Sequence, residues 1–150
     1  MKLVQLVPPP AIALILLLLG FLGSKLFVPL HFIVFQSYTL GLIITIIGLG
    51  LILWAALLFI LAKTPIRPHQ TPKKLVTKGP YQFSRNPMYL GILCILLGCS
   101  LWQATLGVYL AAGIYFLFMD WVIVPQEEKT VKKSLGQPYL VYKKRVHRWL

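Results

Sequence analysis

Residues 40–62, LGLIITIIGLGLILWAALLFILA, form a run of 23 residues without a charged side chain. An α-helix of about 20 consecutive apolar residues is long enough to cross a lipid bilayer. Hydrophobic residues make up 58% of the 150 residues of the chain and charged residues only 12%, whereas a typical soluble domain carries about 25% charged residues. The run therefore predicts a transmembrane helix, and the composition predicts an all-α integral membrane protein.

Other apolar segments lie on both sides of this run. The 38 residues from 87 to 124 contain a single charge, Asp120, and are long enough for two short crossings joined by a tight turn. The first apolar run is interrupted by Lys25, whose flexible side chain can extend to the interface. The prolines at residues 8–10 and the lack of a clean small-residue cleavage site favour a span over a signal peptide. We therefore expect one domain, residues 1–150, with four transmembrane helices at about 10–27, 40–62, 87–102 and 105–124.

The basic residues are distributed unevenly. The net charge is +12, and 13 of the 15 lysines and arginines fall in the loop 63–86 and the tail 125–150. Two spans separate these segments, so both lie on one side of the membrane, and an excess of Lys and Arg marks the cytoplasmic side. We therefore expect both termini in the cytoplasm, as in a multi-pass protein of a prokaryotic inner membrane. This charge suits anionic lipid head groups, and the aromatic residues are not interleaved with it as in a nucleic-acid surface.

Small residues in the spans predict close helix packing, because they let two backbones approach each other. The two cysteines point in different directions on one helix and are expected to be packing residues, and the three histidines lack the spacing of metal ligands. We therefore expect neither a disulfide nor a metal site. The small residues in question are Gly41, Gly48, Gly50, Gly91, Gly98, Gly107 and Ala111.

Residues 79–91, GPYQFSRNPMYLG, concentrate the signals of a turn and of a helix start between two apolar segments. Asn86 is a favourable N-cap, and Pro87 suits the first position of the span that follows. The loop before it contains four prolines, which exclude a long helix, and it is longer than a connection between spans requires. Such a loop is commonly functional.

The acidic residues of the chain lie at the same membrane face as this loop. The chain has three of them, Asp120, Glu127 and Glu128. Together with the loop they predict a small polar pocket in which carboxylates face a cation and aromatic rings. Each feature also has a purely structural interpretation, as a turn, a helix start or a carboxylate at a helix N-terminus. The loop residues that would take part are Tyr81, Arg85 and Tyr89.

The tail predicts two short helices. Pro125 would open the first after the last span, and Gly136 would end it. Pro138 would open the second. Its apolar stripe and basic opposite face are typical of an amphipathic helix on a membrane surface. The stripe consists of Tyr139, Tyr142, Val146 and Trp149, and the basic face of Lys143, Lys144, Arg145 and Arg148.

Three segments in this order, LVTKGPYQFSRNPMYLG (75–91), the glutamate pair and LGQPYLVYKKRVHRWL (135–150), resemble one family of integral membrane enzymes. This is the isoprenylcysteine carboxyl methyltransferase and phospholipid methyltransferase family, and the resemblance covers about residues 60–150. It implies transfer of a methyl group from S-adenosylmethionine to a lipophilic acceptor at the cytoplasmic membrane face. It also implies that the loop and the tail helices form the cofactor pocket.

The resemblance further implies a role for each site residue. Glu127 would bind the amino group of the cofactor's methionine part, and Glu128 would support it. Arg85 would pair with the cofactor carboxylate or with Glu128. Apart from the resemblance, an amine or thiol acceptor needs a base, for which Asp120 or Glu128 is available. Asp120 could equally pair with the tail. The residues expected to bind the cofactor are Leu75, Val76, Tyr81, Asn86, Pro87, Met88, Tyr89 and Glu127.

Two departures from the family pattern bear on the acceptor. Asn86 replaces a common histidine, which excludes a histidine base there. Ile123 stands where prenylcysteine-specific members carry an arginine for the substrate carboxylate. A prenylcysteine carboxylate, a phospholipid amine and another small apolar nucleophile all remain open as acceptors. Two other function classes are a non-catalytic membrane protein that binds lipids or partners, and an NADPH-dependent membrane reductase.

Overall fold

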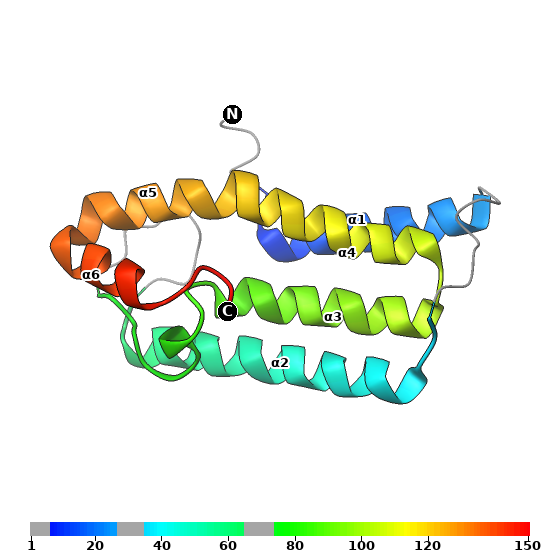
Figure 1. Ribbon diagram of the computed structural model, residues 1–150, viewed down its shortest axis with the longest axis horizontal. Helices are drawn as coiled ribbons and strands as arrows, with labels where there is room; N and C mark the ends of the chain where they lie inside the picture. Colours follow the sequence, from blue (N-terminus) through cyan, green and yellow to red (C-terminus); the bar gives the residue numbers. More distant parts are fainter. Residues whose placement is uncertain (1–6, 27–34, 65–73) are drawn as a thin grey trace.

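All regular structure in the described part of the chain is helical (Figure 1). The structure is a computed structural model and describes residues 7–26, 35–64 and 74–150. Part of the predicted loop, with residues 65–73, and residue 27 of the first predicted span lie outside these residues. The elements are α1 (Pro9–Leu26), α2 (Tyr38–Leu61), the 3-10 helix η3 (Gly79–Gln82), α3 (Pro87–Gln103), α4 (Leu106–Phe118), the π-helical turn η4 (Met119–Ile123), α5 (Val124–Leu135) and α6 (Gln137–Arg145).

Within the described residues, three helices are long and apolar enough to cross a membrane. They are α1 with 18 residues, α2 with 24, and the helix Leu106–Leu135 with 30, which runs through α4, η4 and α5. α3 is apolar but has 17 residues, a length of about 25 Å at 1.5 Å per residue, against a hydrocarbon core of about 30 Å. The prediction of an all-α membrane fold is confirmed, whereas a fourth crossing by α3 stays a prediction.

The long helices form a bundle in which α3 lies between α2 and α4, and α1 packs against α4 (Figure 1). α6, the tail and the described part of the loop gather at one end of this bundle. Many large apolar side chains of α2 remain exposed, among them Ile46 at 58% and Leu53 at 69%. Contiguous apolar surface of this kind is rare on soluble monomers, and it suits contact with lipid.

Glycines bring α2 and α3 into backbone contact at two levels. A Cβ atom added to Gly48 would lie 2.6 Å from the carbonyl oxygen of Gly91, and one added to Gly91 would lie 2.7 Å from that of Gly48. Gly41 and Gly98 face each other in the same way, with 2.8 and 2.7 Å. The expected close packing is therefore present at these four positions. It is absent at Gly50, where an added Cβ would meet nothing within 4 Å.

Small residues also bring α1 and α4 into backbone contact. An added Cβ on Gly20 would lie 2.6 Å from the carbonyl oxygen of Gly107 and 3.1 Å from the Cβ of Ala111. Ser24 extends this contact, because its Oγ donates to the carbonyl oxygen of Gly20 at 2.8 Å and lies within hydrogen-bonding distance of Thr105 Oγ1, at 3.0 Å. The predicted small-residue pair of Gly107 and Ala111 is thus the place where α1 packs closely against α4.

The helix does not break at Pro125, where the sequence predicts the end of a span and a new helix. The chain passes through η4 instead, in which the N–H of Val124 donates to the carbonyl oxygen of Met119. Pro125 has no N–H to donate and its ring clashes with the carbonyl four residues earlier. The wider π turn directly before it accommodates this proline, so α5 continues from α4 and ends at Gly136 (φ 57°), as predicted.

The apolar stripe of the tail faces the protein and not a membrane surface. Tyr139, Tyr142 and Val146 are buried in one cluster, against which Leu75, Val131 and Leu135 pack. α6 ends at Arg145, because Val146 adopts an extended conformation (φ −120°, ψ 133°). The helical periodicity on which the stripe was based therefore does not reach residue 149. Arg148 turns inward as a result.

Candidate functional site

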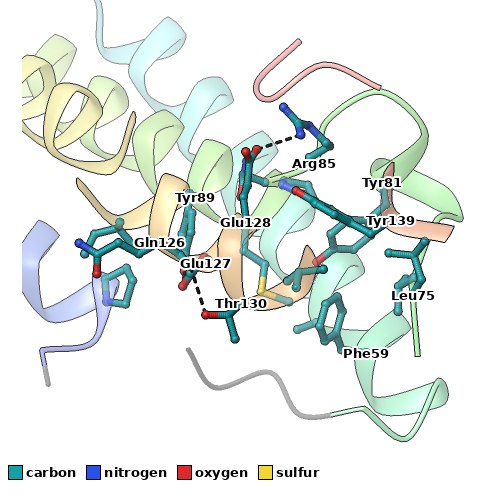
Figure 2. Close-up of a pocket in the computed structure, with 18 of the residues that line it drawn as sticks. Phe59, Leu75, Tyr81, Arg85, Tyr89, Gln126, Glu127, Glu128, Thr130 and Tyr139 are labelled. Atoms are coloured by element: carbon teal, nitrogen blue, oxygen red, sulfur yellow. Dashed lines mark hydrogen bonds and ion pairs between the residues drawn. The ribbon is translucent and has the colours of Figure 1, made fainter. Parts of the chain in front are cut away.

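A pocket of about 490 Å³ lies where the loop, the start of α3, α5 and α6 meet (Figure 2). Small-molecule sites are commonly cavities of about 300–1,000 Å³. All eight residues expected to bind the cofactor line this pocket, and so do Arg85 and Glu128. The residues come from the loop, from α3 and from α5, so the fold gathers positions that are up to 53 apart in the sequence.

η3 places Tyr81 in the wall of the pocket. Gly79 (φ 59°) turns the chain into η3, and Tyr81 is buried with its ring 5.4 Å from the ring of Phe59 on α2. The hydroxyl of Tyr142 donates to the carbonyl oxygen of Tyr81 at 2.7 Å. Burial raises the pKa of Tyr142 to about 12, so this phenol keeps its proton at neutral pH. α6 is therefore bonded directly to the loop.

The first turn of α3 and the first turn of α5 meet through Tyr89 and Glu127. The hydroxyl of Tyr89 donates to Glu127 Oε1 at 2.6 Å, a short distance that is typical of a hydrogen bond to a charged oxygen. Pro87 begins α3 as predicted. This bond holds the Glu127 carboxylate at the pocket.

Three cations converge on Glu128, which is buried. Arg85 Nη1 lies 2.9 Å from its Oε1 and Lys143 Nζ 2.7 Å from its Oε2, while Arg148 Nε lies 3.5 Å from Oε1. Arg85 thus makes the second of its two expected pairings, with Glu128 (Figure 2). Opposite charges stabilise an ionised carboxylate, which makes Glu128 a poor proton acceptor.

The ion pair of Arg85 leaves hydrogen-bonding capacity on its guanidinium. Its Nη1 is close to Glu128 but not aligned for a hydrogen bond, and its Nε also lacks a hydrogen-bond partner within the described ranges. Both atoms are buried. Buried donors are normally paired, so Arg85 can accept a further anionic partner in the pocket.

Asp120 lies in η4 and is not among the residues that line the pocket. Its Oδ1 accepts from Arg148 Nη1 at 2.8 Å and from Trp149 Nε1 at 2.9 Å. Of its two expected roles, the structure shows the pairing with the tail.

Asn86 is the N-cap residue of α3, but its side chain makes no capping hydrogen bond. Its Nδ2 donates instead to the carbonyl oxygen of Arg148 at 3.1 Å. The capping expectation was therefore right about the position and wrong about the bond. The side chain joins the start of α3 to the tail.

Several lining residues were not among the predicted site residues. Gln126 and Thr130 flank the glutamates on α5 (Figure 2), and helical spacing from Glu127 could have identified Thr130, which follows it by three residues. Phe59 on α2 and the prolines at residues 8–10 also line the pocket. No local motif marks these, because they reach the site only through the packing of α1 and α2.

Comparisons with known proteins identify the family of the chain. A family model described as Phospholipid methyltransferase matches residues 36–138, which include all eight expected cofactor residues. An uncharacterized protein of Haemophilus influenzae is 35% identical over 63 residues, which are 42% of this chain and the whole of that protein. No solved structure matches the chain. The matched family implies methyl transfer to lipid-related substrates. The chain belongs to the phospholipid methyltransferase family.

Proposed function

We propose that the protein transfers the methyl group of S-adenosylmethionine to a lipophilic acceptor at the cytoplasmic face of the membrane. The observation that carries this proposal is the convergence of all eight expected cofactor residues on one pocket. The resemblance names these residues from the sequence alone. A chance arrangement would scatter some of them away from the cavity.

The groups in the pocket fit the charges of this cofactor, which has a sulfonium, an ammonium and a carboxylate. Glu127 supplies a fixed anion for the ammonium, held in place by Tyr89. Arg85 Nε and Nη1 are buried and have no hydrogen-bond partner among the described residues, so they suit the cofactor carboxylate. Tyr81 and Phe59 offer an aromatic wall for the adenine ring.

When bound, S-adenosylmethionine supplies an electrophilic methyl group on sulfur. An acceptor with a free electron pair would take this methyl group, and S-adenosylhomocysteine would leave as the second product. The protein contributes orientation and exclusion of water. Neither candidate base is well placed, because Asp120 is bound to the tail and Glu128 to three cations. Catalysis by positioning agrees with both findings.

The acceptor would approach from the membrane side of the pocket. There the lining is apolar and includes Ile52 of α2, Ile92 of α3 and Ile123 of η4. The basic loop and tail would face the cytoplasm, from which the soluble cofactor enters. An acceptor with a lipid chain thus meets the cofactor at the boundary between the two environments.

Isothermal titration calorimetry of the purified protein in detergent tests this function. S-adenosylhomocysteine, the product of the cofactor, is expected to bind to the wild type and not to Glu127→Ala. The matched control is Lys129→Ala, two residues further along α5 and exposed, which should bind normally. Binding of NADPH in place of S-adenosylhomocysteine would support a reductase. Binding of neither by well-folded protein would refute the methyltransferase proposal and favour a non-catalytic role.

A further inference from the structure

Residues 146–149, named here the tail segment, connect two walls of the pocket, one formed by the loop before α3 and the other by α5. The segment follows α6 and lies beyond the residues that match the family model, 36–138. Its own residues do not line the cavity. It nevertheless forms hydrogen bonds or ion pairs with the loop before α3, with η4 and with α5. It could therefore fix the positions of these elements relative to one another.

Towards the loop, the tail segment offers backbone carbonyl groups. The carbonyl oxygen of His147 accepts from the backbone N–H of Arg85 at 3.0 Å. The carbonyl oxygen of Arg148 accepts from Asn86 Nδ2 at 3.1 Å and from Ser84 Oγ at 3.4 Å. Arg85 and Asn86 both line the pocket. The main chain of the tail segment therefore fixes residues that form one wall.

Towards the long helix, the tail segment offers side chains. Arg148 Nη1 bonds to Asp120 Oδ1 at 2.8 Å and to the carbonyl oxygen of Asp120 at 3.2 Å. The same guanidinium reaches Glu128, with Nε 3.5 Å from Oε1 and Nη2 3.5 Å from Oε2. Trp149 adds its Nε1 bond to Asp120 and a ring contact with Phe116 at 5.1 Å. One guanidinium thus spans the π turn and Pro125.

We propose that Arg148 is a positioning residue for cofactor binding. Its side chain holds the carboxylates of Asp120 and Glu128, which lie on either side of Pro125, while its carbonyl holds the start of α3. The two pocket walls that carry Asn86 and Glu127 are thereby fixed relative to each other. The planar fork of arginine suits two acceptors at once, whereas lysine provides only a point charge. This inference rests on the proposed function, since it concerns the same pocket.

The proposal predicts that substitution of Arg148 lowers the affinity for the cofactor, although Arg148 does not itself line the pocket. If the walls are no longer held, the binding-competent conformation is populated less, and the apparent affinity falls by the same fraction. A fall to a competent fraction of about 10% weakens binding about tenfold. The amide hydrogen of Arg85 should also exchange faster, because its acceptor, the carbonyl oxygen of His147, is released.

The experiment compares Arg148→Gln with Arg145→Gln in full-length protein in detergent. Arg145 is the matched control, because it is exposed at the end of α6 and does not line the pocket. We expect Arg148→Gln to bind S-adenosylhomocysteine about tenfold more weakly and to exchange faster in the peptide covering residues 83–87. Arg145→Gln should match the wild type in both measurements. Unchanged affinity and unchanged exchange in Arg148→Gln would overturn the proposal.

A second set of variants separates positioning from a general loss of structure. Asp120→Asn removes one partner of Arg148 and is nearly isosteric. In a double-mutant cycle, the two substitutions together should weaken binding no more than Arg148→Gln alone, and additive effects would count against the bridge. Arg148→Lys should recover part of the affinity. If the wild type binds no S-adenosylhomocysteine, the proposed function fails, and hydrogen exchange at residues 83–87 still decides whether Arg148 holds the wall.

Discussion

Two alanine substitutions on α2 should have opposite effects, although their sites are only two residues apart. In Gly48→Ala the new Cβ would lie 2.6 Å from the carbonyl oxygen of Gly91 and 2.9 Å from the Cβ of Cys94. A backbone oxygen cannot rotate away as a side chain would, so α2 and α3 must separate. In Gly50→Ala nothing lies within 4 Å of the new atom, and the helix only gains a residue of higher propensity.

The magnitudes follow from these contacts. Overpacking of a well-packed site costs about 1–3 kcal/mol, and alanine recovers up to about 1 kcal/mol of helix propensity over glycine. We expect Gly48→Ala to be destabilised by about 1–2 kcal/mol and Gly50→Ala to be neutral or slightly stabilised. For a chain of this size, each kcal/mol shifts the melting temperature by about 2–4 °C.

Thermal unfolding of both variants in the same detergent measures the difference. The expected order of melting temperatures is Gly50→Ala at or above the wild type and Gly48→Ala below it. Equal melting temperatures for the two variants would show that the backbones of α2 and α3 do not touch at Gly48, and the helix pairing would have to be revised.

Three further predictions concern the site. Tyr89→Phe removes the 2.6 Å hydrogen bond to Glu127, and a hydrogen bond to a charged group contributes about 1.5–3 kcal/mol. Titration calorimetry should therefore show that S-adenosylhomocysteine binds to this variant at least about tenfold more weakly. Unchanged affinity would argue against Glu127 as the ammonium site. Glu128→Gln leaves three cations around a neutral amide. It should lower the melting temperature more than Lys143→Gln, which removes one half-exposed cation from Glu128. The reverse order of melting temperatures would contradict the convergence of charge on Glu128. Tyr142→Phe loses the bond to the carbonyl oxygen of Tyr81, worth about 1 kcal/mol. Since burial raises the pKa of Tyr142 to about 12, its contribution is complete below its ordinary pKa of about 10 and is lost as the pH rises through 12, so the stability difference between wild type and Tyr142→Phe should shrink over that interval.

Much of the fold follows from local sequence signals. The uncharged run at 40–62 and the Asn86 and Pro87 start of the next helix appear in the structure as α2 and α3. These signals are strong because the length of an apolar run and a proline at a first helical turn depend only on neighbouring residues. The pocket residues could be named in advance for a different reason. They carry a motif whose order and spacing are shared with a family, and their cofactor-binding role stays a prediction.

The parts that could not be predicted depend on contacts between distant residues. Pro125 would end most helices, but the π turn before it lets the helix continue, and nothing local distinguishes the two outcomes. The stripe of Tyr139 and Tyr142 has the periodicity of a membrane-surface helix, yet the loop and α5 cover it. An apolar face shows that something must cover it and does not show whether lipid or protein does so.

Position 86 shows how a departure from a family motif can become intelligible once the structure is known. By comparison with the family motif, Asn86 stands where a histidine is common, so the position lacks a histidine base. In the structure its amide donates to the carbonyl oxygen of Arg148 and thereby ties the start of α3 to the tail. An amide does not titrate between pH 5 and 8, unlike a histidine, whose ordinary pKa is about 6.5. The bond between loop and tail is therefore independent of protonation at this position, and Asn86 contributes to the pocket by holding its wall.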